Sequence, residues 1–191
     1  AQTLHLAEQG ALRPYTSPNS DFAQQPPGQM WTSFGGRARV LIVNTDLVSF
    51  ADWPTGLADF LSDRWDPSDL AISHPLFGTS ATHAAALYSA WGAGRAKQFY
   101  QELNARGVNI VDGNSVVRDL AVRGEILFGL TDTDDACNAV ARGGPVAVIF
   151  PDQNLGAIGT FVIPNTVALI AGSPHPEQAA QLIDFLLRAA V

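Results

Sequence analysis

The chain has 191 residues, of which 47% are hydrophobic and only 15% are charged, a composition that excludes a disordered chain or a coiled coil. Its formal net charge of −7 argues against binding to nucleic acids or to anionic membranes. The single cysteine, Cys137, leaves no internal disulfide and no CxxC metal pair. The sequence has no apolar run of the length that a transmembrane helix needs, and its first residues lack the pattern of a signal peptide.

The apolar periodicity predicts the elements in chain order. Residues 3–10 form the end of a helix that stops at Gly10, and a surface connection leads to an apolar strand at 39–43. Farther along, strands alternate with helices: strands at 70–72, 108–111, 127–130 and 146–150, and helices at 81–92, 96–106, 115–123 and 134–142. Such alternation predicts an α/β domain with a largely parallel sheet.

Two long apolar strands, at 39–43 and 166–170, flank this α/β block, and a final helix begins at Pro176. The pattern is typical of a domain that the chain enters and leaves through a pair of crossing strands. Only short elements lie outside the block, and they could not bury their own apolar faces. We therefore expect them to be remnants of a second lobe that is mostly missing.

Polar residues stand at the junctions between predicted strands and the helices that follow. In an α/β domain these junctions collect ligands, because exposed N–H groups and the helix dipole favour anions there. The candidate ligand-binding residues of the first two junctions are Gly78, Thr79, Ser80, Asn114 and Ser115. A simpler interpretation is also open, since Ser, Thr, Asn and Asp commonly cap helices.

The third junction, within GLTDTDDACNAV at residues 129–140, places Asp132, Asp134 and Asp135 inside four positions. These carboxylates could ligate a hard metal ion through oxygen, or cap the next helix and favour its dipole. Arg37 and Arg39 point to the same face of their strand and need carboxylate or anion partners, either in a ligand or in a surface salt bridge.

Other reactive side chains have ordinary interpretations. We interpret His83 as structural and Cys137 as a small core residue. The sequence contains no GxSxG, Walker A or GxGxxG motif, and no nucleophile and base can be paired from it. The sequence therefore does not support an enzyme.

Four stretches together resemble one protein family: WTSFGGRARVLIVNTDLV, HPLFGTSATHAAAL, GVNIVDGNSVVRDLAVRGEILFGLTDTDDA and IPNTVALIAGSPHPEQAAQLIDFLL. They resemble the periplasmic iron(III)-type substrate-binding proteins of ABC transporters, over nearly the whole chain and in the same order. The resemblance implies a type II periplasmic-binding-protein fold of two α/β lobes with the ligand in the cleft. It makes 39–47 and 161–170 the hinge strands, 48–160 the second lobe, and 1–38 and 171–191 remnants of the first lobe, with the chain truncated at both ends.

The resemblance also implies a ligand site. The anion site of the family matches Arg37, Thr79, Ser80 and Asn114. Many members place two adjacent tyrosines where this chain has Asp134 and Asp135. We expect a metal ion with a synergistic anion at this place, although two aspartates suit other cations or an amine better than iron(III).

Two hypotheses follow for the function. The first is a periplasmic or otherwise extracytoplasmic solute-binding protein, or a fragment of one, which delivers a metal ion or small anion to an ABC permease without catalysis. The second is a structural lobe that self-associates, as a homodimer, to cover the apolar surface and strand edges left bare by the missing lobe.

Overall fold

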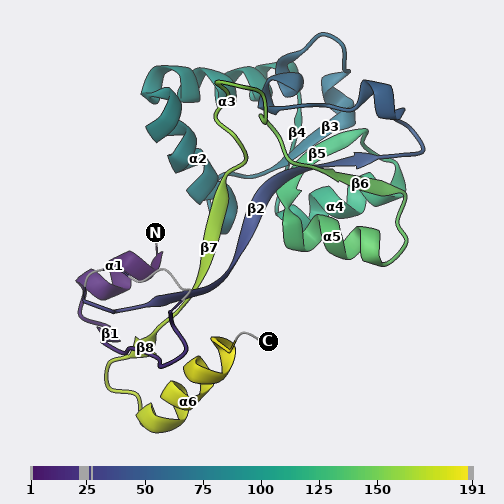
Figure 1. The fold of residues 1–191 in the computed structure, drawn as a ribbon. Coiled ribbons are helices and arrows are strands. Elements are labelled where there is room, and N and C mark those ends of the chain that lie inside the picture. The colour runs from purple at the N-terminus through teal and green to yellow at the C-terminus, as the bar shows by residue number, and fades with distance from the viewer. Residues whose placement is uncertain (1, 22–25, 27, 189–191) are drawn as a thin grey trace. The chain divides into compact units, whose positions relative to one another are not determined.

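The computed structural model describes residues 2–21, 26 and 28–188 of the chain. Contacts divide the chain into two compact units (Figure 1). Unit 1 comprises Ala1–Gly36 and Pro164–Val191, and unit 2 comprises Arg37–Ile163. The long strand β2, Thr32–Asn44, crosses the boundary between the units at Gly36, and β7, Val162–Val167, crosses it again at Pro164.

Unit 2 is built on a mixed sheet in the order β4-β3-β5-β2-β6, and β7 pairs with β2. The strands of this path besides β2 are β3 (Leu70–Ser73), β4 (Asn109–Val111), β5 (Phe128–Asp132) and β6 (Val146–Ile149). Strand β3 runs parallel to both β4 and β5, whereas β2 runs antiparallel to β5 and β6. The parallel part of the sheet therefore consists of β3, β4 and β5.

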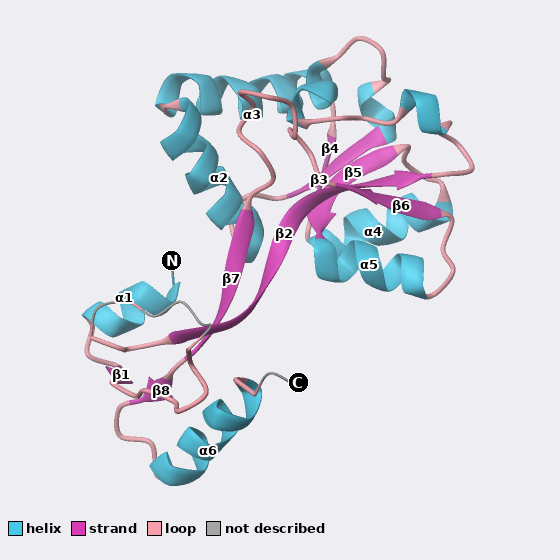
Figure 2. Cartoon of the chain, viewed as in Figure 1, coloured by secondary structure: helices cyan, strands magenta, loops and turns pink. Residues whose placement is uncertain are grey.

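Helices cover both faces of this sheet (Figure 2). They are α2 (Gly78–Trp91), α3 (Ala93–Arg106), α4 (Asn114–Arg123) and α5 (Thr133–Ala141). Three short 3-10 helices, Phe50–Asp52, Leu57–Leu61 and Pro67–Asp69, lie between β2 and β3 in the sequence. The arrangement is a three-layer α/β sandwich, as expected for strands that alternate with helices.

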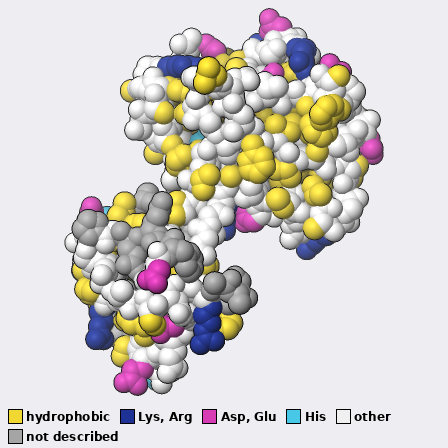
Figure 3. Space-filling model, in the orientation of Figure 1, with side chains coloured by type: hydrophobic (Ala, Val, Ile, Leu, Met, Phe, Trp, Pro, Cys, Tyr) yellow, Lys and Arg dark blue, Asp and Glu magenta, His cyan; other side chains and the backbone are white. Residues whose placement is uncertain are grey.

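Alternate residues of β2 enter two separate cores. Leu41 and Val43 pack with residues of α2, α3 and the second 3-10 helix, whereas Val40 and Ile42 pack with residues of α4 and α5. All four side chains are fully buried. Burial of each such side chain stabilises the fold by about 1.5–3 kcal/mol, which explains an apolar run without polar alternation. Some large apolar side chains of unit 2 remain exposed, as yellow atoms in Figure 3 indicate for one face.

Unit 1 holds the shorter elements. They are α1 (Gln2–Glu8), β1 (Leu12–Arg13), β8 (Leu169–Ile170) and α6 (Pro176–Leu186). Strands β1 and β8 pair antiparallel, and a small core forms around Leu169, Ile183 and Leu187. This unit has far fewer buried apolar residues than unit 2.

The predicted α/β fold class is confirmed, with two differences in detail. The sheet is mixed because β2 inserts antiparallel between β5 and β6. The interpretation of Cys137 as a core residue is wrong, because its side chain is exposed while its helix buries Ala136 and Ala139 instead. The predicted domain boundaries and hinge strands stay a prediction.

Candidate functional site

Three helices of unit 2 begin at the same edge of the sheet. Strands β4, β3 and β5 are parallel neighbours, and each leads directly into α4, α2 or α5. A hollow of about 300 Å³ lies at this edge. It is lined by Arg37, Ser73, His74, Phe77, Gly78, Thr79, Ser80, Asp112, Gly113, Asn114, Asp132 and Asp135. We call this hollow the helix-start site.

None of these three helices is capped by a side chain. The N-cap residues are Phe77 for α2, Gly113 for α4 and Asp132 for α5, and none of them makes a side-chain cap hydrogen bond. Phe77 and Gly113 have no side-chain atom that could accept a hydrogen bond from the helix, and the carboxylate of Asp132 accepts from Arg39 instead. The first N–H groups of a helix have no intrahelical partner. Three sets of such N–H groups therefore meet around one hollow, and the simple capping interpretation of these junctions is wrong.

Asp132, which lines the helix-start site, belongs to a buried ion pair. Arg39 on β2 lies directly opposite Asp132 on β5 in the antiparallel register, and Nη1 of Arg39 donates to Oδ1 of Asp132 at 2.6 Å. Each residue is only 1% exposed. Burial lowers the pKa of Arg39 while Asp132 raises it, and a guanidinium remains charged under all ordinary conditions. Each of these charges thus depends on the other for compensation.

The other oxygen of Asp132 accepts hydrogen bonds from two predicted anion ligands. Oγ1 of Thr79 donates to Oδ2 of Asp132 at 2.5 Å, and Nδ2 of Asn114 donates to the same oxygen at 2.9 Å. Oδ1 of Asn114 in turn accepts from Arg39 at 2.9 Å and from Ser73 at 2.7 Å, and Ser80 bonds to Ser73. These side chains therefore already hold a carboxylate that belongs to the protein, so the groups that remain for a ligand are mainly backbone N–H groups.

Arg37 is the cation of the site that a ligand can reach. Its side chain is 35% exposed, and its Nη1 lies 3.2 Å from Asp134 and 3.9 Å from Asp132. Its Nε is buried and has no hydrogen-bond partner among the described residues. The prediction that Arg37 and Arg39 share a face and need carboxylate partners is confirmed, since both approach Asp132.

The two aspartates predicted as metal ligands have separate partners. Asp134 is paired with Arg37, and Asp135 bonds to Arg118 at 3.0 Å. Burial, followed by Asp134, raises the pKa of Asp135. No group of three or more His, Cys, Asp or Glu residues in the described part of the chain could hold a metal ion. Asp135 lines the helix-start site, whereas Asp134 and the exposed Ser115 do not.

Sequence reasoning did not assign the central roles of Asp132 and Ser73. Asp132 is the last residue of β5, and the sequence placed it in the third junction without distinguishing it from its neighbours. The register of β2 against β5 is what gives Asp132 its special position, and register is a tertiary property. The predicted residues Arg37, Gly78, Thr79, Ser80, Asn114 and Asp135 do come together around the site.

Comparisons with known proteins agree with this fold. Iron-bound HitA from Pseudomonas aeruginosa superposes with a TM-score of 0.84 at 21% identity, over 98% of this chain and 61% of that chain. Trichodesmium IdiA (FutA) in complex with iron and citrate gives a TM-score of 0.73 at 20% identity, and the match covers 96% of this chain and 61% of that chain. AfuA from Actinobacillus pleuropneumoniae with bound fructose-6-phosphate gives a TM-score of 0.74 at 21% identity, and the match covers 95% of this chain and 59% of that chain.

These similarities establish the fold and not the ligand, because the identities are low. The chain spans about 60% of the length of these solved structures. No curated protein sequence matches the chain. None of the described helices is long and apolar enough to cross a membrane. The family model for bacterial extracellular solute-binding proteins matches residues 2–191. The chain therefore belongs to the bacterial extracellular solute-binding protein family.

Proposed function

We propose that the chain acts as a periplasmic solute-binding protein, or as part of one, which binds a small anionic solute at the helix-start site and delivers it to an ABC permease without changing it chemically. The family to which the chain belongs supports the solute-binding role. The observation that carries the anion assignment is the meeting of three helix starts without side-chain caps. Helix starts of this kind bind anions through N–H groups and the helix dipole.

Charge defines which anions fit best. Arg37 offers one accessible cation, whereas Asp132, Asp134 and Asp135 put negative charge at or beside the site. A free dianion meets more repulsion here than an anionic group whose charge is partly offset by a cation. We therefore propose that the solute carries its own positive charge, as a bound metal ion or as an amine, on the side that faces Asp134 and Asp135. This extends the predicted metal role of the two aspartates, with the metal as part of the cargo.

A substitution at Gly113 tests the anion assignment. Gly113 is the N-cap of α4 with φ −167° and ψ 169°, and a Cβ built there meets nothing within 4 Å. In Gly113→Asp a carboxylate would cap α4 and occupy the place of the anion, while stabilising the helix by about a few tenths of a kcal/mol. We expect weaker binding together with unchanged or higher thermal stability.

Calorimetric titration with phosphate, citrate and iron(III) citrate measures this binding, and native mass spectrometry reads bound mass and subunit count. Gly94→Asp is the matched control, because it adds the same charge at an equally open position near the start of α3, away from the helix-start site. If wild type binds none of the three probes, or if Gly113→Asp and Gly94→Asp bind alike, the anion assignment fails. The subunit count tests the predicted homodimer independently.

A further inference from the structure

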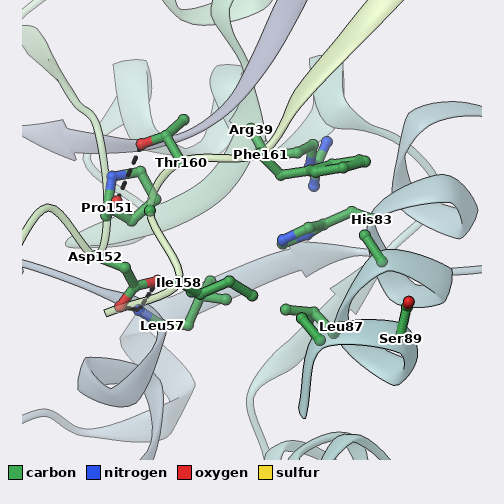
Figure 4. Close-up of a pocket in the computed structure, with 13 residues that line it drawn as sticks. Arg39, Leu57, His83, Leu87, Ser89, Pro151, Asp152, Ile158, Thr160 and Phe161 are labelled. Carbon is green, nitrogen blue, oxygen red and sulfur yellow. Dashed lines mark hydrogen bonds between the residues drawn. The ribbon is translucent and has the colours of Figure 1, made fainter. Parts of the chain in front are cut away.

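A second cavity of unit 2 lies apart from the helix starts. It has a volume of about 410 Å³ and is bounded by α2, by Leu57 of the second 3-10 helix and by the segment 151–161 (Figure 4). Leu57, Leu87, Ile158 and Phe161 contribute apolar walls, and His83 and Asp152 are among the polar groups. Cavities of this size with apolar walls and a few polar groups are typical binding sites for small organic molecules.

His83 is the first polar group of this cavity. It is 5% exposed, and its ring stacks on Phe161 with centroids 5.9 Å apart and an interplanar angle of 17°. Burial, followed by the charge of Arg39, lowers the pKa of His83 to about 3, so the ring is neutral at physiological pH. The described residues offer it no hydrogen-bond partner, and Figure 4 shows a ring nitrogen directed toward the side of the cavity where Ile158 and Asp152 lie.

Asp152 is the second polar group, and the backbone holds it in an unusual conformation. Its φ of 58° lies in the left-handed region, and its N–H donates to Thr55 at 2.8 Å. Its carboxylate passes so close to Gly56 that a Cβ at that position would collide with it. Gly56 therefore leaves room for this carboxylate to lie beside the cavity.

No cation among the described residues forms an ion pair with the carboxylate of Asp152. It accepts only long hydrogen bonds from the N–H of Leu57, at 3.3 and 3.4 Å, and no ion pair among the described residues includes it. Burial raises the pKa of Asp152, the hydrogen bond from the N–H of Leu57 lowers it, and the charges of Asp59 and Arg95 raise and lower it in turn. The buried Arg39, which also borders the cavity, is neutralised by Asp132. A partly buried carboxylate without a counter-ion favours a ligand that carries a cation.

We propose that this cavity is a second binding site, which takes a small aromatic amine with its ring against the apolar walls and its ammonium group on Asp152. The neutral His83 can accept a hydrogen bond from a donor on the ring. This site is separate from the helix-start site and does not depend on the proposed solute.

A matched pair of probes tests the charge preference of the cavity. Tryptamine and indole-3-acetate share an aromatic ring system but carry opposite charges. We expect calorimetry to show that wild type binds tryptamine at least about tenfold more tightly than indole-3-acetate. Asp152→Asn keeps the size of the side chain and should reduce that ratio to near one. Absence of tryptamine binding, equal affinity for the two probes, or an unchanged ratio in Asp152→Asn would overturn the proposal.

A pair of neighbouring substitutions tests the location. Ala86 lines the cavity, whereas Ala85 is exposed on the same helix and does not. Ala86→Phe should weaken tryptamine binding at least about tenfold by filling the cavity, and Ala85→Phe should leave it within about twofold. Equal binding by the two variants would contradict the location. If circular dichroism shows Ala86→Phe to be unfolded, the Asp152→Asn ratio decides. Gly113→Asp should leave tryptamine binding unchanged, which separates this proposal from the anion assignment.

Discussion

Replacement of Asp132 by Asn removes the negative charge on which the helix-start site is built. In the native protein Asp132 neutralises Arg39 at 2.6 Å, and both residues are 1% exposed. Loss of one partner from a buried pair leaves an uncompensated charge, which costs about 3–5 kcal/mol. The same change removes the ionised acceptor of the Thr79 hydroxyl and the Asn114 amide. We therefore expect Asp132→Asn to lower the free energy of unfolding by about 3–5 kcal/mol.

An external anion should restore part of that loss. In Asp132→Asn the guanidinium of Arg39 and the hydroxyl of Thr79 lose their carboxylate partner, and both Thr79 and residue 132 line the hollow. Sulfate that binds there stabilises the folded state by about 1.4 kcal/mol when it is at tenfold its dissociation constant. Wild type should gain less, because its own carboxylate occupies those donors.

Urea unfolding in sodium sulfate and in sodium chloride of equal ionic strength measures this rescue. Sulfate also stabilises proteins in general, so a matched variant is needed. Asp63→Asn serves as that control, because Asp63 pairs with Arg106 on the surface at 2.9 Å and does not line the helix-start site. We expect this variant to lose less than about 1 kcal/mol and to show no specific sulfate effect. If sulfate stabilises both variants equally, Asp132 is not a substitute for an anion and the reasoning is refuted.

Three further predictions concern other parts of unit 2. The pKa of His83 is about 3 in the folded protein and 6.5 in the unfolded chain, so only the unfolded state takes up the proton between these values. Stability should fall as pH falls through that window, by about 5 kcal/mol in total, and His83→Gln should lose this dependence in urea unfolding between pH 4 and pH 7. Gly129→Ala would place a Cβ 2.8 Å from the carbonyl oxygen of Ala71 in the buried sheet, and thermal unfolding should reveal a cost of about 1–3 kcal/mol; a neutral result would mean that the sheet adjusts. The double variant Asp134→Ala, Asp135→Ala should stay folded by circular dichroism and lose binding of iron(III) citrate more than binding of phosphate; equal losses would argue against a metal or amine facing these carboxylates.

Local sequence patterns predicted most elements of unit 2, because apolar periodicity reflects which residues are buried and glycine marks where helices end. The helix predicted at 96–106 is confirmed, with Phe99 and Leu103 buried, and the left-handed Gly107, with φ 86°, explains where it ends. The buried strand at 39–43 is also confirmed, although β2 begins earlier, at Thr32. Residues 32–38 are not continuously buried as 39–43 are, so their apolar content did not predict a strand there.

The sequence does not show which face of the helix at 81–92 turns inward. Leu87 is buried, but the large apolar Tyr88 is 42% exposed and the polar His83 is buried. Alanines and small polar residues fill most of this helix, so its periodicity does not define one apolar face. Which side turns inward is decided by tertiary neighbours such as Phe161, which stacks on His83 from a distant part of the chain.

The same limit applies to the helix-start site. The sequence identified the junctions, because glycine and hydroxyl residues between a strand and a helix have a local signature. It did not identify the pairing of Arg39 with Asp132, because that pairing depends on which strands become neighbours and in which register. Nor could it reveal that the caps are absent, since Thr79 and Asn114 have the side chains of capping residues but direct them to Asp132.

The proposed anion site consists mainly of main-chain groups, and this has a consequence for how its residues evolve and how they are studied. An alanine scan removes no N–H group, so the helix starts after Phe77, Gly113 and Asp132 would keep their attraction for anions through almost every single substitution. The side chains around the hollow can then change, and the preferred solute changes with them. The N–H groups continue to bind the anionic group of the solute. Such a site adapts to new ligands when the side chains around the hollow are replaced. A proline or an added carboxylate at a helix start is the substitution that would abolish its anion binding.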